Sequence, residues 1–137
     1  MRISLLGQAA LIALLATAGV SHAAPYRDGH CQIDAPADWV KSKTRIARAD
    51  KKMWASLLEA PTAAEIVNME VGLKAVKVSE DARQVVLVST ASYGGLTNKL
   101  YHVVSKTSPA CVADVAAPAG PDEALAKKIG QTVTAVK

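Results

Sequence analysis

Aromatic residues are scarce in this chain of 137 residues, which has two Trp, three Tyr and no Phe. Proteins that bind single-stranded nucleic acid stack bases on aromatic side chains, and no RNP-like string occurs here either. The formal net charge of +4 falls short of the concentrated positive charge of a nucleic-acid-binding domain. The composition therefore predicts that the partner is not a nucleic acid.

The motifs of common catalytic and metal sites are also missing. The sequence contains no G-x-S-x-G, no C-x-x-C, no His-x-x-x-His, no Gly-Lys-Ser/Thr phosphate loop and no Asp/Asn-rich calcium loop. The Gly-rich stretch at 92–98 is followed by a predicted strand, whereas a phosphate loop or a nucleophile elbow leads into a helix. We predict no catalytic residue, no metal ligand and no cofactor.

Few side chains are left that could perform chemistry. His30 stands beside a cysteine, and His102 alternates with apolar residues in a predicted strand, so both have structural explanations. Two adjacent acid pairs, at 80–81 and 122–123, stand at a turn and at a helix start, where we expect solvated carboxylates with ordinary pKa values. The alternative is an enzyme with an unfamiliar site around Tyr93, Tyr101 and His102.

Only one long hydrophobic run occurs, at residues 3–20, and it follows a single basic residue, Arg2. Polar and glycine residues dilute the run, and no Lys or Arg follows until Arg27, so a stop-transfer flank is missing. We predict a cleaved secretory signal peptide over residues 1–23, cut between Ala23 and Ala24, with an uncleaved anchor as the alternative. The remaining residues, 24–137, then form one small domain in the periplasm or outside the cell.

The chain has two cysteines, Cys31 and Cys111, both in the part predicted to be exported. An even number of cysteines in an oxidising compartment predicts one disulfide bond. Free reactive thiols or a metal site are the alternatives, although His30 beside Cys31 gives no ligand set with metal-binding spacing.

The order of local patterns predicts an α+β fold. A strand is expected over 30–36, after a short polar lead-in, and residues 53–61 form either a strand or a helical turn. Thr62 to Glu65 form a capping box that opens a helix with apolar residues at 66, 67, 69 and 73. β-Branched runs between 74 and 117 predict an antiparallel meander, and apolar residues at 125, 129, 133 and 136 predict a closing helix. We expect four to six strands with two helices packed against them.

This element order resembles the PsbP/Mog1-type sandwich. The resemblance depends on the opening strand that runs into Pro and Trp, "CQIDAPADW", on the mid-chain helix and meander, and on the closing helix ending in "KKIGQTV". It implies an α+β sandwich and a binding role, because members act mostly as assembly factors or accessory proteins. No functional residue is carried over, since no functional motif matches.

One stretch has a conspicuous charge. Six cations and one acid fall within residues 41–52. If the chain is extended, residues 41, 43 and 45 (Lys41, Lys43 and Arg45) share a face, whereas residues 41, 45, 48 and 52 (Lys41, Arg45, Arg48 and Lys52) share one if it is helical. Such a segment is either a solvated surface or a contact for an anionic envelope surface or an acidic protein. Tyr93, beside the Gly-rich turn, is a second candidate contact.

These observations predict a small exported protein, non-catalytic, that binds or helps to assemble another component of the cell envelope. An inhibitor or immunity-type protein that blocks a toxin or a hydrolase is the alternative within the class of binding proteins.

Overall fold

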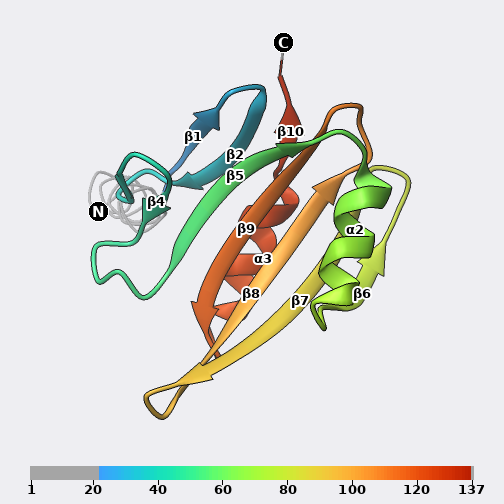
Figure 1. The fold of residues 1–137 in the computed structure, drawn as a ribbon. Coiled ribbons are helices and arrows are strands. Elements are labelled where there is room, and N and C mark those ends of the chain that lie inside the picture. The colour runs from blue at the N-terminus through green and yellow to red at the C-terminus, as the bar shows by residue number, and fades with distance from the viewer. Residues whose placement is uncertain (1–21, 137) are drawn as a thin grey trace, which may run out of the picture.

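The computed structural model describes residues 22–136, so most of the predicted signal peptide lies outside the described residues. Within them, the chain forms two helices and ten strands in two antiparallel sheets (Figure 1). A three-stranded sheet has the order β1-β2-β10, and a seven-stranded sheet has the order β3-β4-β5-β9-β8-β7-β6. The elements are β1 (Ala23–Asp28), β2 (Cys31–Pro36), β3 (Val40–Lys41), β4 (Ile46–Ala47), β5 (Trp54–Ala60), α2 (Ala63–Gly72), β6 (Val76–Glu80), β7 (Gln84–Tyr93), β8 (Leu96–Ser105), β9 (Ala110–Pro118), α3 (Glu123–Gln131) and β10 (Thr134–Ala135).

The α+β class, the antiparallel meander and the two helices are confirmed, but the sheets contain more strands than the four to six predicted. The lead-in at 24–29 is largely strand β1, which pairs with β2 through a turn in which Gly29 has a φ of +59°. Residues 53–61, for which the sequence predicts either a strand or a helical turn, contain strand β5. Short strands β3, β4 and β10 had no pattern long enough to predict them.

The two helices cover opposite faces of the seven-stranded sheet (Figure 1). On one face, α3 and the β1–β2 hairpin enclose the larger apolar cluster, which includes Ile33, Val103, Val115 and Ile129. On the other face, α2 packs its Ile66 into a smaller cluster over β5, β7, β8 and β9. The seven-stranded sheet is therefore the middle layer of the fold.

The predicted disulfide bond is present between Cys31 of β2 and Cys111 of β9. Both residues are fully buried, and their Cα atoms lie 5.5 Å apart. The bond joins the hairpin layer to the centre of the main sheet and closes a loop between residues 80 positions apart.

Each helix begins as predicted, but neither continues as the apolar spacing indicated. At α2, Thr62 Oγ1 accepts a hydrogen bond from the Glu65 N–H at 3.3 Å, which is the hydroxyl half of the predicted capping box. The sheet-facing residue one turn after Ile66 is Glu70, however, and Met69 and Leu73 are exposed. The closing helix stops at Gln131, because residues 134–135 leave it to pair with β2.

No helix among residues 22–136 is long and apolar enough to cross a membrane. Ala23 and Ala24, the residues beside the predicted cleavage point, stand opposite Pro36 and Ala35 in the β1–β2 pair.

Candidate functional site

Side chains on the α2 face of the sheet form rows that run across the strands. Because alternate residues of a strand point to the same face, the strand registers fix which residues share a row. Under α2, the row is apolar and includes Leu58, Val112, Val104 and Val85. The next row, called the polar row below, includes Ser56, Asp114 and His102, together with the buried Leu87 of β7. The row beyond it contains Trp54, Ala116, Leu100 and Ser89.

α2 is too short to cover all of these rows. Its ten residues span about 15 Å, whereas the ten residues of β7 or of β8 span about 34 Å. The helix lies over the end of the sheet near the apolar row, and no other helix of residues 22–136 lies over the opposite end of the same face (Figure 1).

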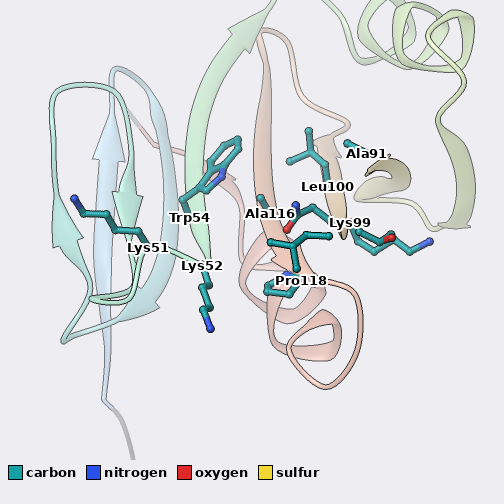
Figure 2. Close-up of a pocket in the computed structure, with 11 residues that line it drawn as sticks. Lys51, Lys52, Trp54, Ala91, Lys99, Leu100, Ala116 and Pro118 are labelled. Atoms are coloured by element: carbon teal, nitrogen blue, oxygen red, sulfur yellow. The ribbon is translucent and has the colours of Figure 1, made fainter. Parts of the chain in front are cut away.

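A groove of about 450 Å³ lies on this uncovered part of the face. Its floor is Ala116, a small residue between the Trp54 indole on β5 and Leu100 on β8 (Figure 2). Leu96, which is 68% exposed, and Pro118 add further apolar surface. The volume falls in the range of small-molecule and side-chain binding pockets.

Lysines rim this groove. Lys51 and Lys52 come from the loop before β5, and Lys99 comes from β8 (Figure 2). Lys99 lines the groove near its backbone only, because strand alternation places its side chain on the α3 face with Tyr101, where the ammonium donates a hydrogen bond to Thr90 Oγ1 at 2.9 Å. The cations at the edge of the groove are therefore Lys51 and Lys52. The groove therefore combines an apolar floor with a positively charged edge.

A second hollow of about 380 Å³ adjoins the groove and shares Trp54 and Lys51 with it. Lys41 and Arg45 line this second hollow, and the Arg45 guanidinium carbon lies 4.2 Å from the centroid of the Trp54 ring. This stacking is a cation–π contact, which orients both side chains. The basic segment, residues 41–52, forms neither a helix nor one regular strand. It contains only part of β3 and the short strand β4, and bends and turns connect these strands to each other and to β5.

The cations predicted as partner contacts have different surroundings. Lys41, Lys43 and Arg45 are exposed. Arg48 is half-buried and makes ion pairs at 3.0 Å with Asp50 and with Asp122, the residue before α3. These two carboxylates raise the pKa of Arg48, Asp50 contributing more. Arg48 therefore joins the β4–β5 loop to the start of α3.

Tyr93 is the last residue of β7 and pairs with Leu96 across the Gly-rich turn. Its side chain lies outside the part of the chain that the structure describes.

The structure adds three lining residues that sequence reasoning missed, Trp54, Leu96 and Lys99. A β-strand pattern could have placed Trp54 and Lys99 on strands, but only the register across β5, β9 and β8 brings them to one groove.

His102 lies in the polar row between a carboxylate and a hydroxyl, in the order Asp–His–Ser that a hydrolase catalytic triad has. Its Nδ1 lies 2.7 Å from Asp114 Oδ1, and its Nε2 lies 2.9 Å from Ser89 Oγ. A fourth residue changes the chemistry, because the Glu70 carboxylate from α2 also lies 3.5 Å from Nε2. The His102 side chain is almost fully buried among these groups.

Two carboxylates around one imidazole favour its charged form. Burial disfavours the charge, but the hydrogen bond and charge of Asp114, together with the charge of Glu70, outweigh it and raise the pKa of His102. In the imidazolium both ring nitrogens carry protons, so Nε2 donates to Ser89 instead of accepting its proton. This cluster joins α2 to the sheet, and an imidazolium in it cannot accept the proton of Ser89.

The other residues considered for chemistry are dispersed. Tyr101 faces the α3 side of the sheet, where its hydroxyl donates to Glu123 at 3.0 Å, so strand alternation separates it from His102. The expectation of ordinary pKa values is wrong for Glu80, Asp81 and Glu123. Hydrogen bonds from Lys106 and Lys77 lower the pKa of Glu80 to about 2, and backbone N–H donors lower the pKa of Asp81 and of Glu123. Among residues 22–136, no group of three potential ligands stands where it could hold a metal ion.

Comparisons with known proteins show similarity at the level of the fold. No family model matches the chain, and no curated protein matches it. Nine chains of solved structures match it. One is a protein from Bacteroides thetaiotaomicron VPI-5482, known from a crystal structure at 1.50 Å resolution. It aligns with a TM-score of 0.58 and 11% sequence identity over 86% of this chain. The chain spans half of that protein's length. The resemblance to the PsbP/Mog1-type sandwich is not tested by these matches and stays a prediction.

Proposed function

We propose that the protein is an exported, non-catalytic binding protein that holds an acidic partner of the cell envelope on its basic surface. We define the basic surface as the exposed cations Lys41, Lys43, Arg45, Lys51 and Lys52. The observation that carries the proposal is that all of these cations except Lys43 line the two hollows beside Trp54, whose lining residues, all described, include no acid. Export is supported by the buried disulfide bond, since such bonds persist in oxidising compartments.

A third hollow shows that this charge pattern is local. It lies near the start of β1 and the C-terminal half of α3, and Asp34 and Asp38 line it together with Arg48 and Lys128. Mixed charge there gives no preference for an anionic partner, whereas the two hollows beside Trp54 present cations alone. Positive potential of this kind steers an acidic partner towards the surface and accelerates association.

The test is cross-linking and affinity capture of the tagged full-length protein from the envelope of the cells that encode it. Reversing the charges of Lys41, Lys43 and Arg45 to Glu is expected to reduce capture of the partner and the dependence of capture on salt. A partner captured equally by this variant and by the native protein would refute the proposal. The control variant reverses three exposed cations on other segments, Lys74, Arg83 and Lys128.

The same experiment distinguishes a general accessory protein from an inhibitor. A partner recovered in a tight one-to-one complex that loses hydrolytic activity on binding would assign the inhibitor or immunity role. The predicted export is checked separately by the mass of the native protein, which is expected to begin at Ala24.

A further inference from the structure

The two hollows beside Trp54 lie next to each other on the surface. Trp54 and Lys51 line both, so an occupant that crosses Trp54 enters each hollow in turn. The combined site is an open surface channel, about 450 Å³ on one side of Trp54 and 380 Å³ on the other. An extended peptide fits such a site, because successive side chains reach separate hollows while the backbone passes between them.

The lining specifies the chemistry of that peptide. The groove offers apolar surface from Trp54, Leu96 and Leu100, which suits an apolar or aromatic anchor side chain. Its rim beside Trp54, and the neighbouring hollow, offer ammonium and guanidinium groups without any acid, which suits carboxylates next to the anchor.

Lys51 provides independent support, because its backbone has a φ of +61°. This left-handed conformation costs a residue with a Cβ roughly 1 kcal/mol, and glycine adopts it freely. The chain nevertheless places a long cationic side chain there, at the point that both hollows share. Backbone strain of this kind occurs at ligand-binding positions.

From these observations we infer that the channel around Trp54 binds an extended acidic segment of the partner protein, with one apolar anchor side chain seated in the groove over Ala116. This inference rests on the proposed function and names the form in which the partner is recognised. The ammonium of Lys51 contacts the carboxylates that flank the anchor.

The experiment titrates the protein, purified from the envelope, with a short fluorescent peptide in which Asp and Glu flank one Trp and one Leu. Fluorescence anisotropy is expected to show saturable binding that weakens as salt rises. A peptide with Ala in place of Trp and Leu tests the anchor, and vesicles containing an anionic phospholipid test a membrane surface instead.

Two variants separate binding from stability. Lys51→Gly is expected to lower affinity about tenfold while the Tm stays equal to or rises above that of the native protein, because glycine accepts the positive φ. Leu96→Ser is expected to weaken binding several-fold without loss of Tm, because its side chain is 68% exposed.

Each variant has a matched control outside the channel. Lys74 also has a positive φ, +76°, and Lys74→Gly removes the same charge after α2. Leu73 is 67% exposed, and Leu73→Ser makes the same change on another surface. Both controls are expected to bind the peptide like the native protein.

The inference is overturned if the peptide does not bind, if the Ala-substituted peptide binds equally well, or if vesicles bind while the peptide does not. Equal affinity of the channel variants and their controls also overturns it. Failure here is distinguishable from failure of the proposed function: partner capture that depends on Lys41, Lys43 and Arg45 but ignores Lys51 and Leu96 would keep the basic surface and reject the channel.

Discussion

Gly130 allows a sharp test of how α3 packs on the sheet. A Cβ added at this position would lie 2.6 Å from Val103 Cγ2 and 3.5 Å from Val115 Cγ2, and both valines are fully buried. A carbon–carbon separation of 2.6 Å is far inside van der Waals contact, which begins near 3.5 Å. Replacing glycine with alanine must therefore move the helix away from the sheet or force Val103 out of its rotamer.

The magnitude follows from two opposing contributions. Overpacking a close-packed core costs about 1–3 kcal/mol, whereas alanine stabilises a helix by up to about 1 kcal/mol relative to glycine. We expect Gly130→Ala to lower the free energy of unfolding by about 1–2 kcal/mol. That loss corresponds to a fall in Tm on the order of 5 °C or more for a domain of this size.

Gly72 is the matched control, since it ends the other helix and an added Cβ there meets no atom within 4 Å. Gly72→Ala is expected to leave stability unchanged or to raise it by up to about 1 kcal/mol. Urea unfolding of the oxidised protein, followed by circular dichroism, measures both. Equal effects of the two alanine variants would refute the packing argument. In a Val103→Ala background, which removes the colliding methyl groups, Gly130→Ala is expected to lose most of its cost.

Other features of the fold give three further tests. Replacing Cys31 and Cys111 together with Ala is expected to lower the free energy of unfolding by up to about 4.5 kcal/mol, from the entropy of an 80-residue loop; a loss below about 1 kcal/mol, or free thiols in the unreduced native protein, would contradict it. Asp114 raises the pKa of His102 from 6.5, so the contribution of the imidazolium is complete below pH 6.5 and lost as pH rises through the raised value. The native protein should then lose stability relative to His102→Gln between pH 6.5 and alkaline pH, and parallel pH profiles would be inconsistent with this. Thr62→Ala is expected to cost about 1 kcal/mol by uncapping α2, and an unchanged urea midpoint would exclude that contribution.

The central part of the fold was accessible from the sequence because local signals and tertiary structure agree there. The β-branched runs that predicted the meander form β6 to β9, paired in chain order. The capping box at Thr62 and the acidic first turn at Glu123 mark the two helix starts. These signals depend on neighbours in the sequence, so they can be interpreted without knowing the fold.

Elements that depend on distant partners were harder to predict. β1 contains a proline and two charged residues, and only Tyr26 is buried, so its sequence is polar although it pairs with β2 along its whole length. The Asp28–Gly29 pair before the first predicted strand is the hairpin signal that could have identified it. Likewise, Val133 is buried as helical spacing predicts, yet the chain has already left α3, because β10 pairs with β2.

The candidate site was predicted only in part, for a similar reason. A charge count identified Lys41 and Arg45, but the apolar half of the channel comes from residues on three strands whose neighbours in sequence face the opposite side. A single aromatic such as Trp54 carries no signal of its own in an alternating strand. Only the strand register, which places the small residue Ala116 between Trp54 and Leu100, shows that these three residues form a groove.

The polar row also explains why the groove is open and why its variants need not unfold the protein. Glu70 reaches His102 from α2, and this contact places the end of the helix over the polar row, with Leu73 exposed beyond it. The α2 cluster extends into this row only through Leu87, which pairs with His102, and the apolar side chains of the groove lie beyond the row. Because the Leu96 side chain is 68% exposed and is not a member of the α2 cluster, its loss should leave that cluster intact. A partner that fills the groove can then add its binding energy without rearranging the core.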